Sequence, residues 1–439
     1  MEMHDSELCR RMRAEVDKIK IIDTHEHLTL PDSLIEAGKL DFGRLFTHYA
    51  KCDLISAGMP AQEMEKVADP KSGWSPMEKW RALKPYYEKS WNTAYCECLR
   101  IAMRDIYGIE DLRDDTVEAL SEKMNAVERA SWTRTVFDKA GIEVAMFNGS
   151  STPAYHRKRF PDLFLYDMCD SFSGFDPAGL SKDSGIEIRG LKDYLRVIDW
   201  YFDKFADEAA ALKIGCAYER TLFFAEVPED DASRICDRAL ADRESLSQSE
   251  FRALQDFIFH HLVRTAGEHD LPVKVHAGLQ EGNGNDITNS RAALLINLFM
   301  KYPKTKFDIF HISWPYTEEL TAICKNFPNV WIDFCWAWIF NPPAARRALS
   351  DMLETVPANK IHGFGGDFIF VEGTYGHAVI ARREIARVLA EKVEEGRFSE
   401  KQAVGIARRL LRENALESFR VEEKRRIYAE RARSEIGRS

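Results

Sequence analysis

The sequence has little that would place the protein in a membrane, in an oxidising compartment or on nucleic acid. No apolar run is long enough to cross a bilayer, and residues 1–7 lack the basic region and apolar core of a signal peptide. The nine cysteines are scattered, odd in number and form no CxxC pair, which favours reduced thiols over a disulfide framework. A net charge of -10 without clustered lysine and arginine argues against a general nucleic-acid binder. We therefore expect a cytoplasmic protein with no membrane and no nucleic-acid partner.

The sequence also lacks the features that divide a chain into modules. It has no Gly/Ser-rich or Pro-rich linker, no internal repeat and no low-complexity tract. The glycines of 363–366 do not have GxGxxG spacing, so the nucleotide-binding turn of a dinucleotide fold is missing. With 45% hydrophobic and 30% charged residues, the chain can bury a sizeable core. We predict a single domain over residues 1–439.

Short β-like runs alternate with longer helical patterns along most of the chain. This alternation requires parallel strands, and eight βα units are typical of a (β/α)8 (TIM) barrel. The candidate strands are 21–23, 142–147, 163–169, 212–216, 273–276, 307–311, 330–334 and 361–364. The candidate helices are 5–18, 188–211, 249–269, 289–301, 316–326, 342–354 and 374–394.

Residues 31–131 interrupt the alternation after the first strand. The segment has several helical patterns and many aromatic residues, among them Trp74, Trp80 and Trp91. Because it follows a strand that ends in two histidines, we predict a helical cap inserted over a site at the barrel mouth. A last helical region, 399–432, interleaves arginine with glutamate and is predicted to be solvated.

Polar side chains follow the predicted strands where barrel enzymes carry their active sites, at the carboxyl ends. His25 and His27 are two residues apart on the first strand, so both rings point the same way. His276, His311 and Asp367 follow the fifth, sixth and eighth strands. Each has another interpretation, either a hydrogen-bonded core histidine or an aspartate that caps the next segment. Because four strand ends share the pattern, we predict a site for a divalent metal.

This ordered set of residues on eight βα units resembles the amidohydrolase superfamily. More narrowly, the C-terminal half is similar to the amidohydrolase-related (amidohydrolase 2) group, in particular to the amidohydrolase domain of fungal FluG and of glutamine-synthetase fusions, and more remotely to uronate isomerases. Three segments carry the similarity: 211–220 (ALKIGCAYER), 274–278 (KVHAG) and 412–416 (RENAL). The resemblance covers most of the chain except 31–131.

The resemblance implies a role for each of the five residues. His25, His27, His276 and Asp367 would bind the metal, and Asp367 would also take a proton from the attacking water. His311 would bind a second metal or polarise the substrate, and His276 or His311 would stabilise the oxyanion. A divalent ion lowers the pKa of bound water and polarises a scissile carbonyl. Zn²⁺ suits ligands rich in nitrogen, with Mn²⁺ or Fe²⁺ as alternatives.

The number of metal ions depends on Lys213, in the fourth predicted strand. In binuclear relatives a lysine of that strand is carbamylated and bridges two ions, whereas many members of the narrower group use one. We expect one ion, and two if Lys213 is carbamylated. Without that modification, Lys213 would form an ion pair or bind substrate.

Several further residues are expected around the substrate. Arg220 could hold a substrate carboxylate in bidentate fashion, although a surface salt bridge is the alternative. Tyr218 and Trp314 are expected to contact the substrate, although aromatic residues near a barrel rim often only pack. Glu372 and His377, in the loop after the eighth strand, could support the ligands.

These expectations lead to one main function and two alternatives. The main one is a hydrolase that cleaves an amide or ester-like bond in a small substrate, which we expect to bear a carboxylate. The first alternative is a decarboxylase or a uronate-type isomerase at the same metal. The second is a catalytically silent barrel that serves as an interaction module, against which the intact ligand set counts. The resemblance also implies a homo-oligomer.

Overall fold

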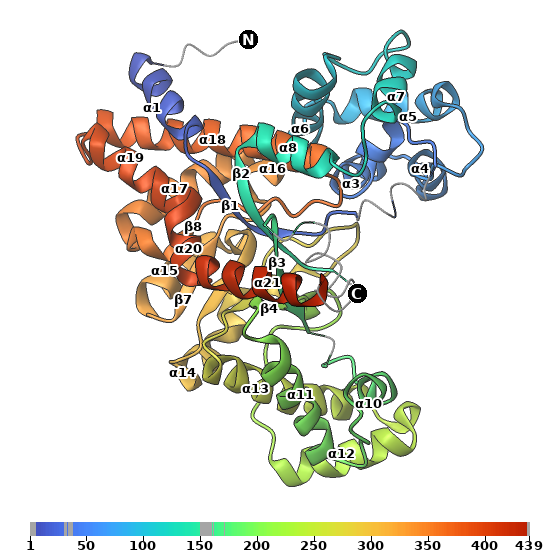
Figure 1. Ribbon diagram of the computed structural model, residues 1–439, viewed down its shortest axis with the longest axis vertical. Helices are drawn as coiled ribbons and strands as arrows, with labels where there is room; N and C mark the ends of the chain where they lie inside the picture. Colours follow the sequence, from blue (N-terminus) through green and yellow to red (C-terminus); the bar gives the residue numbers. More distant parts are fainter. Residues whose placement is uncertain are drawn as a thin grey trace.

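Eight parallel strands form one sheet, in sequence order, around the centre of the molecule (Figure 1). The computed structural model describes residues 6–29, 33, 38–149, 160, 162–170 and 172–436. Backbone hydrogen bonds from Thr24 to Phe364 and from His27 to Phe368 join the first strand to the segment after the eighth. These bonds close the ring, and the predicted (β/α)8 barrel is confirmed.

The strands lie close to their predicted positions. They are β1 Ile21–Glu26, β2 Ile142–Phe147, β3 Phe164–Cys169, β4 Ala209–Ile214, β5 Val273–Val275, β6 Phe307–Ile309, β7 Val330–Asp333 and β8 Ile361–His362. The largest difference is in β4, which begins three residues before the predicted start. Its first residues, Ala209, Ala210 and Ala211, have low strand propensity but are fully buried, so burial in the barrel overrides propensity.

Helices follow the strands and cover the outside of the barrel. They include α11 Leu191–Phe205, α13 Gln248–Glu268, α15 Thr317–Asn326, α17 Pro342–Thr355 and α18 Val371–Glu394, with α8 Trp132–Ala140 before β2 and the shorter α14 Ile296–Lys301 before β6. The chain begins with α1 Glu7–Asp17, which packs on α18. It ends with α19 Glu400–Arg408, α20 Asn414–Ser418 and α21 Val421–Ile436.

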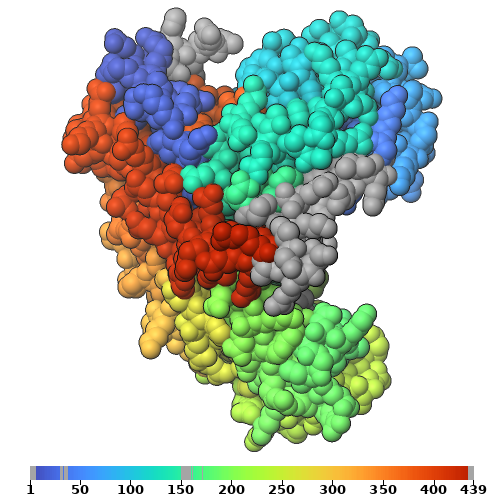
Figure 2. Space-filling view, viewed as in Figure 1, coloured from blue at the N-terminus to red at the C-terminus, as the bar shows by residue number. Residues whose placement is uncertain are grey.

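The segment between β1 and α8 is helical, as the sequence suggests. Its helices are α3 Tyr49–Ser56, α4 Ala61–Ala68, α5 Pro76–Ser90, α6 Ala94–Ala102 and α7 Val117–Asn125. The first residues of the predicted insertion, 31, 32 and 34–37, lie outside the described residues. The insertion forms a projection at one end of the molecule, and α10 Pro177–Ser184 with α12 Glu229–Ala241 forms another at the opposite end (Figures 1 and 2).

The interior of the barrel contains charged side chains as well as apolar ones. Nζ of Lys274, on β5, lies 2.8 Å from Asp167 on β3, and both side chains are fully buried. The same ammonium donates to the carbonyl of Thr24 on β1 at 2.7 Å. The ion pair thus connects three strands just before their carboxyl ends. Among the described helices, none combines the length and the apolar character needed to cross a membrane.

Candidate metal centre

Two histidines of β1 face each other at the carboxyl end of the barrel. Their Nε2 atoms lie 3.0 Å apart. Nδ1 of His27 lies 2.7 Å from the carbonyl oxygen of Asn148, so this nitrogen carries the proton and donates it. Nδ1 of His25 lies 3.6 Å from a carboxylate oxygen of Asp167, which favours the same tautomer. Both Nε2 atoms then present lone pairs to each other, an arrangement that a cation stabilises.

Both rings are neutral and therefore able to act as ligands. Burial, together with the nearby charge of Lys213, lowers the pKa of His27 to about 4. Burial also holds the pKa of His25 well below its usual value. Metal binding consequently needs no proton to be removed from either ring near neutral pH.

Asp367 follows β8 with a left-handed backbone conformation, φ 58°. Its two neighbours are held by side chains of β1: the amide of Gly366 donates to Asp23 and the amide of Phe368 donates to Glu26, both at 3.0 Å. A Cβ atom at position 366 would collide with the carboxyl group of Glu26, so the close approach of the two segments requires glycine. The acids of β1 therefore fix the position of Asp367.

The carboxylate of Asp367 completes a set of three ligands with the two histidines. Its Oδ1 lies 3.4 Å from Nε2 of His27 and 3.7 Å from Nε2 of His25. The ligand atoms of the three residues all lie within 4.8 Å of one another, a spacing that a zinc ion with bonds of about 2.0–2.2 Å can nearly span. Burial raises the pKa of Asp367 to about 7, and a bound cation would lower it again. The residues present thus fit a divalent metal.

His276 does not join this set but pairs with His311. Nδ1 of His276 lies 3.0 Å from Nε2 of His311. The opposite nitrogens lie 2.9 Å from the carbonyl oxygens of Leu279 and Cys335, so they carry the protons. The lone pairs of His276 Nδ1 and His311 Nε2 therefore face each other, as those of the β1 histidines do. Oδ2 of Asp367 lies 3.8 Å from Nε2 of His311. Of the four predicted metal ligands, His25, His27 and Asp367 thus lie together, and His276 lies beside His311, with Asp367 next to both pairs of imidazoles.

A cavity of about 360 Å³ opens beside these ligands. This volume suits a small metabolite. The lining includes the predicted residues His27, Lys213, Tyr218, His276 and Asp367. It also includes His48, Tyr49, Asn148, Cys169, Asp170, Gly215 and Glu281, which the sequence analysis did not identify.

Lys213 projects from β4 into this cavity. The side chain is only 7% exposed, and burial lowers its pKa. Within the described part of the chain, its ammonium forms no hydrogen bond and no ion pair within 4.0 Å. Nζ lies over the ring of Phe310, 5.2 Å from the ring centroid. The structure therefore offers an unpaired amine next to the candidate ligands.

The helical insertion supplies one wall of the cavity. Tyr49, the first residue of α3, donates its hydroxyl proton to the carbonyl of Asp367 at 2.6 Å, and its ring stacks on Trp336 at 4.3 Å. His48 lines the cavity next to it. Tyr218 also lines the cavity, and its hydroxyl accepts the amide proton of Glu281 at 3.0 Å. In the sequence, only the position of the insertion after β1 could have suggested that His48 and Tyr49 line the site.

Two predicted substrate contacts lie elsewhere. The guanidinium of Arg220 pairs with the buried carboxylate of Asp256 at 2.5 Å and donates to the carbonyl of Phe223 at 2.9 Å. Arg220 does not line the cavity, because this buried partner on α13 takes its charge. Trp314 does not line it either; its ring packs on Phe340 with a centroid distance of 5.3 Å.

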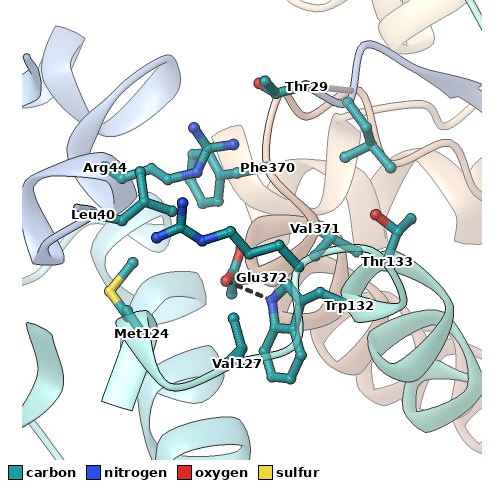
Figure 3. Close-up of a pocket in the computed structure, with 12 residues that line it drawn as sticks. Thr29, Leu40, Arg44, Met124, Val127, Trp132, Thr133, Phe370, Val371 and Glu372 are labelled. Carbon is teal, nitrogen blue, oxygen red and sulfur yellow. Dashed lines mark hydrogen bonds between the residues drawn. The ribbon is translucent and has the colours of Figure 1, made fainter. Parts of the chain in front are cut away.

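Glu372 and His377 also lie outside the cavity. Glu372 accepts hydrogen bonds from Tyr107 at 2.6 Å and from the indole of Trp132 at 2.9 Å, in a separate space of about 20 Å³ between insertion and barrel (Figure 3). That space holds about one water molecule. His377 is buried in α18 with Nδ1 3.2 Å from the carbonyl of Gly366. It can support the loop of Asp367 but does not touch the ligands through any contact found within the described residues.

A third group of ligand-type residues lies within the barrel. Asp308, Asp333 and His362 place ligand atoms within 4.8 Å of one another. Nδ1 of His362 lies 2.9 Å from Asp308, and Nε2 lies 2.9 Å from the hydroxyl of Ser418, which donates its own proton to the carbonyl of Asn414. Both ring nitrogens of His362 thus have partners inside the protein.

Comparison with known proteins agrees with this architecture. Residues 192–421, more than half of the chain, match the family described as Amidohydrolase. The protein fluG of Emericella nidulans is 26% identical over 153 residues, which are 35% of this chain and 18% of that protein. The chain thus matches less than a fifth of that relative.

Two solved structures share the fold over nearly their whole length. The uronate isomerase of Thermotoga maritima has a TM-score of 0.78 and 15% identity, covering 94% of this chain and 97% of its own. The glucuronate isomerase of Caulobacter crescentus has a TM-score of 0.76 and 16% identity, covering 94% of each chain. These similarities establish the fold.

Proposed function

Because the chain belongs to the Amidohydrolase family, whose members are metal-dependent enzymes, we propose that it is a hydrolase that cleaves an amide or ester-like bond in a small substrate bearing a carboxylate. The observation that supports this proposal most directly is the convergence of His25, His27 and Asp367 beside a cavity that contains an unpaired lysine. A divalent ion bound there would act as a Lewis acid that activates water and polarises the carbonyl group of the substrate.

The residues of the chain would share the remaining work. His25, His27 and Asp367 would hold the ion, and zinc is the ion we propose. Asp367 would accept a proton from water and return it to the leaving group, because its carboxylate is buried and lies at the cavity surface. His276, which also lines the cavity, would stabilise negative charge on the substrate, with His311 behind it.

The substrate would be oriented by the cavity walls. Lys213 would pair with its carboxylate, since the ammonium is otherwise unpaired among the described residues. Tyr218, His48 and Asn148 offer hydroxyl, imidazole and amide groups to the same cavity. Arg220 is no longer part of this proposal, because Asp256 occupies its guanidinium.

A second candidate is the isomerisation of a uronate-type sugar acid. It is favoured by the shared fold of the two isomerases, which extends over the insertion that supplies His48 and Tyr49 to the cavity. A polar cavity with one lysine would also suit a hydroxylated acid. In this reaction the site residues would move a proton between neighbouring carbon atoms and would not use water as a reactant.

Product analysis in ¹⁸O-labelled water separates the two reactions. Metal-loaded protein is incubated with a panel of N-acyl amino acids, small carboxylate-bearing esters and uronates, and the products are read by mass spectrometry. Hydrolysis predicts one solvent oxygen in the carboxyl product of an amide or ester. Conversion of a uronate to a ketose without loss of mass would establish the second candidate. Absence of turnover on both substrate classes by metal-loaded protein would contradict both proposals.

A further inference from the structure

Cys335 places a thiol beside the candidate metal centre. It lies two residues after the end of β7, and its Sγ, a ring nitrogen of His311 and an oxygen of Asp367 all lie within 4.8 Å of one another. Cys335 and His311 are fully buried and Asp367 is 6% exposed. Within the described residues the sulfur makes no hydrogen bond. A thiol so placed has either an apolar packing role or a role as a ligand.

The backbone holds Cys335 in this position from both sides. Its amide donates to Asp333 at 2.7 Å, and its carbonyl accepts the Nδ1 proton of His311 at 2.9 Å. A Cβ atom at position 365 would lie 2.9 Å from Sγ, so the sulfur can approach the loop after β8 only because residue 365 is glycine. The hydrogen bond also fixes the tautomer that leaves the Nε2 lone pair of His311 pointing inward.

Asp367 lies between this thiol and the β1 histidines. Its Oδ1 faces His27 at 3.4 Å, whereas its Oδ2 faces His311 at 3.8 Å. The ligand atoms therefore form two overlapping groups that share one carboxylate. Nδ1 of His276, 3.0 Å from Nε2 of His311, adds another lone pair to the second group. A carboxylate with one oxygen toward each group can bridge two cations.

We propose that Cys335 is a thiolate ligand of a second divalent cation, held together with His311 and Asp367 and completed by His276. The inference rests on the proposed metal-dependent function and extends it, because it assigns a ligand from the segment after β7 and predicts which metals bind. Thiolate favours zinc and cobalt over manganese and magnesium. The second ion would not require a carbamylated Lys213, which the sequence analysis had made the condition for two ions.

Cobalt substitution tests the proposal without relying on turnover. Metal-free full-length protein is titrated with Co²⁺, and bound metal and near-ultraviolet absorption are measured together. We expect a thiolate-to-cobalt charge-transfer band that appears with the second equivalent. The Cys335→Ser variant should lose that band and bind the second equivalent at least about tenfold more weakly. A Cys335→Ala variant repeats the measurement in case the serine variant does not fold.

A second thiol provides a matched control. Cys169 also lines the cavity, and its Sγ accepts a hydrogen bond from Asn148 at 3.1 Å. The Cys169→Ser variant should keep both the band and the stoichiometry. A band that persists in both Cys335 variants, or that disappears in Cys169→Ser, would overturn the assignment.

The outcomes for wild-type protein separate this inference from the proposed function. If the protein binds a single cobalt ion without a charge-transfer band and still turns over substrate, the role of Cys335 is refuted and the function stands. If it binds no divalent metal at all, the proposed function fails and this inference fails with it.

Discussion

Glu26 accepts a hydrogen bond from the amide of Phe368 at 3.0 Å, and this contact joins the strand that carries both histidines to the loop that carries Asp367. Its other carboxyl oxygen accepts the hydroxyl proton of Thr374 at 2.7 Å. Glu26 lies between His25 and His27, and its two hydrogen bonds hold the segment after β8. The protein therefore fixes the distance between the two histidines and Asp367, the proposed ligands.

Replacing Glu26 should therefore weaken metal binding although Glu26 is not among the proposed ligands. For Glu26→Ala we expect a loss of affinity of about 10–100-fold, the usual effect of removing a group that orients a ligand. Competition with a chromogenic chelator measures it. Glu26→Gln is the matched control. Burial and the charge of Asp23 raise the pKa of Glu26 well above its usual value, so an amide resembles the protonated acid. Equal affinities for the two variants would contradict this role.

The sequence was sufficient to predict the barrel and to name three side chains that lie together at its mouth. Strand periodicity does not depend on distant contacts, and the carboxyl ends of parallel strands must lie at one end of the barrel. The sequence alone therefore predicts that His25, His27 and Asp367 lie together. Which histidine pairs with which could not be inferred, because it depends on carbonyl groups such as those of Leu279 and Cys335 that choose the tautomers.

The sequence does not indicate the role of residues whose partners are distant along the chain. Arg220 follows a site strand, and only the fold shows that Asp256, 36 residues later, pairs with it. His48 and Tyr49 belong to an insertion whose path over the barrel depends on packing. Cys335 sits at a strand end like the predicted ligands, and that position was the one signal that could have identified it.

The pH dependence of stability should report on Asp23. Burial raises its pKa from 3.8 to about 6. Between these two pKa values the folded state keeps a proton that the unfolded state has lost. The free energy of unfolding therefore falls as pH rises, and the stabilising contribution of protonated Asp23 is lost above about pH 6. In metal-free protein we expect this contribution to be on the order of 1–3 kcal/mol.

Asp23→Asn should remove that contribution, because an amide does not titrate. Urea unfolding from pH 4 to pH 7 compares the two proteins. Relative to the wild type, the variant should gain stability as pH rises through this range. If the two curves of unfolding free energy against pH run parallel, the buried carboxyl group of Asp23 does not titrate in the way the structure indicates.

Arg220 should matter for stability and not for substrate. Arg220→Met leaves the carboxylate of Asp256 buried without its partner, which costs about 3–5 kcal/mol. Urea unfolding measures the loss. Adding Asp256→Asn should restore much of it, since the amide oxygen can still accept from the amide of Ala225. A folded Arg220→Met protein with normal stability and a strongly raised KM would instead return Arg220 to the substrate site.

Lys213 should determine affinity for the substrate carboxylate. Lys213→Met removes the unpaired cation from the cavity while preserving much of the side-chain volume. A charged hydrogen bond contributes about 1.5–3 kcal/mol, so kcat/KM for a carboxylate substrate should fall about 10–150-fold. For a substrate analogue in which an uncharged amide replaces this carboxylate, turnover should change little, because the analogue has no negative charge for Lys213 to bind. Metal content should stay constant, since His276, His311 and Cys335 can hold the second ion without Lys213. Two results together would contradict this role: loss of one metal ion from the Lys213→Met variant, and wild-type activity that returns only when bicarbonate is added. They would show that Lys213 is a bridging carbamate and not a free ammonium.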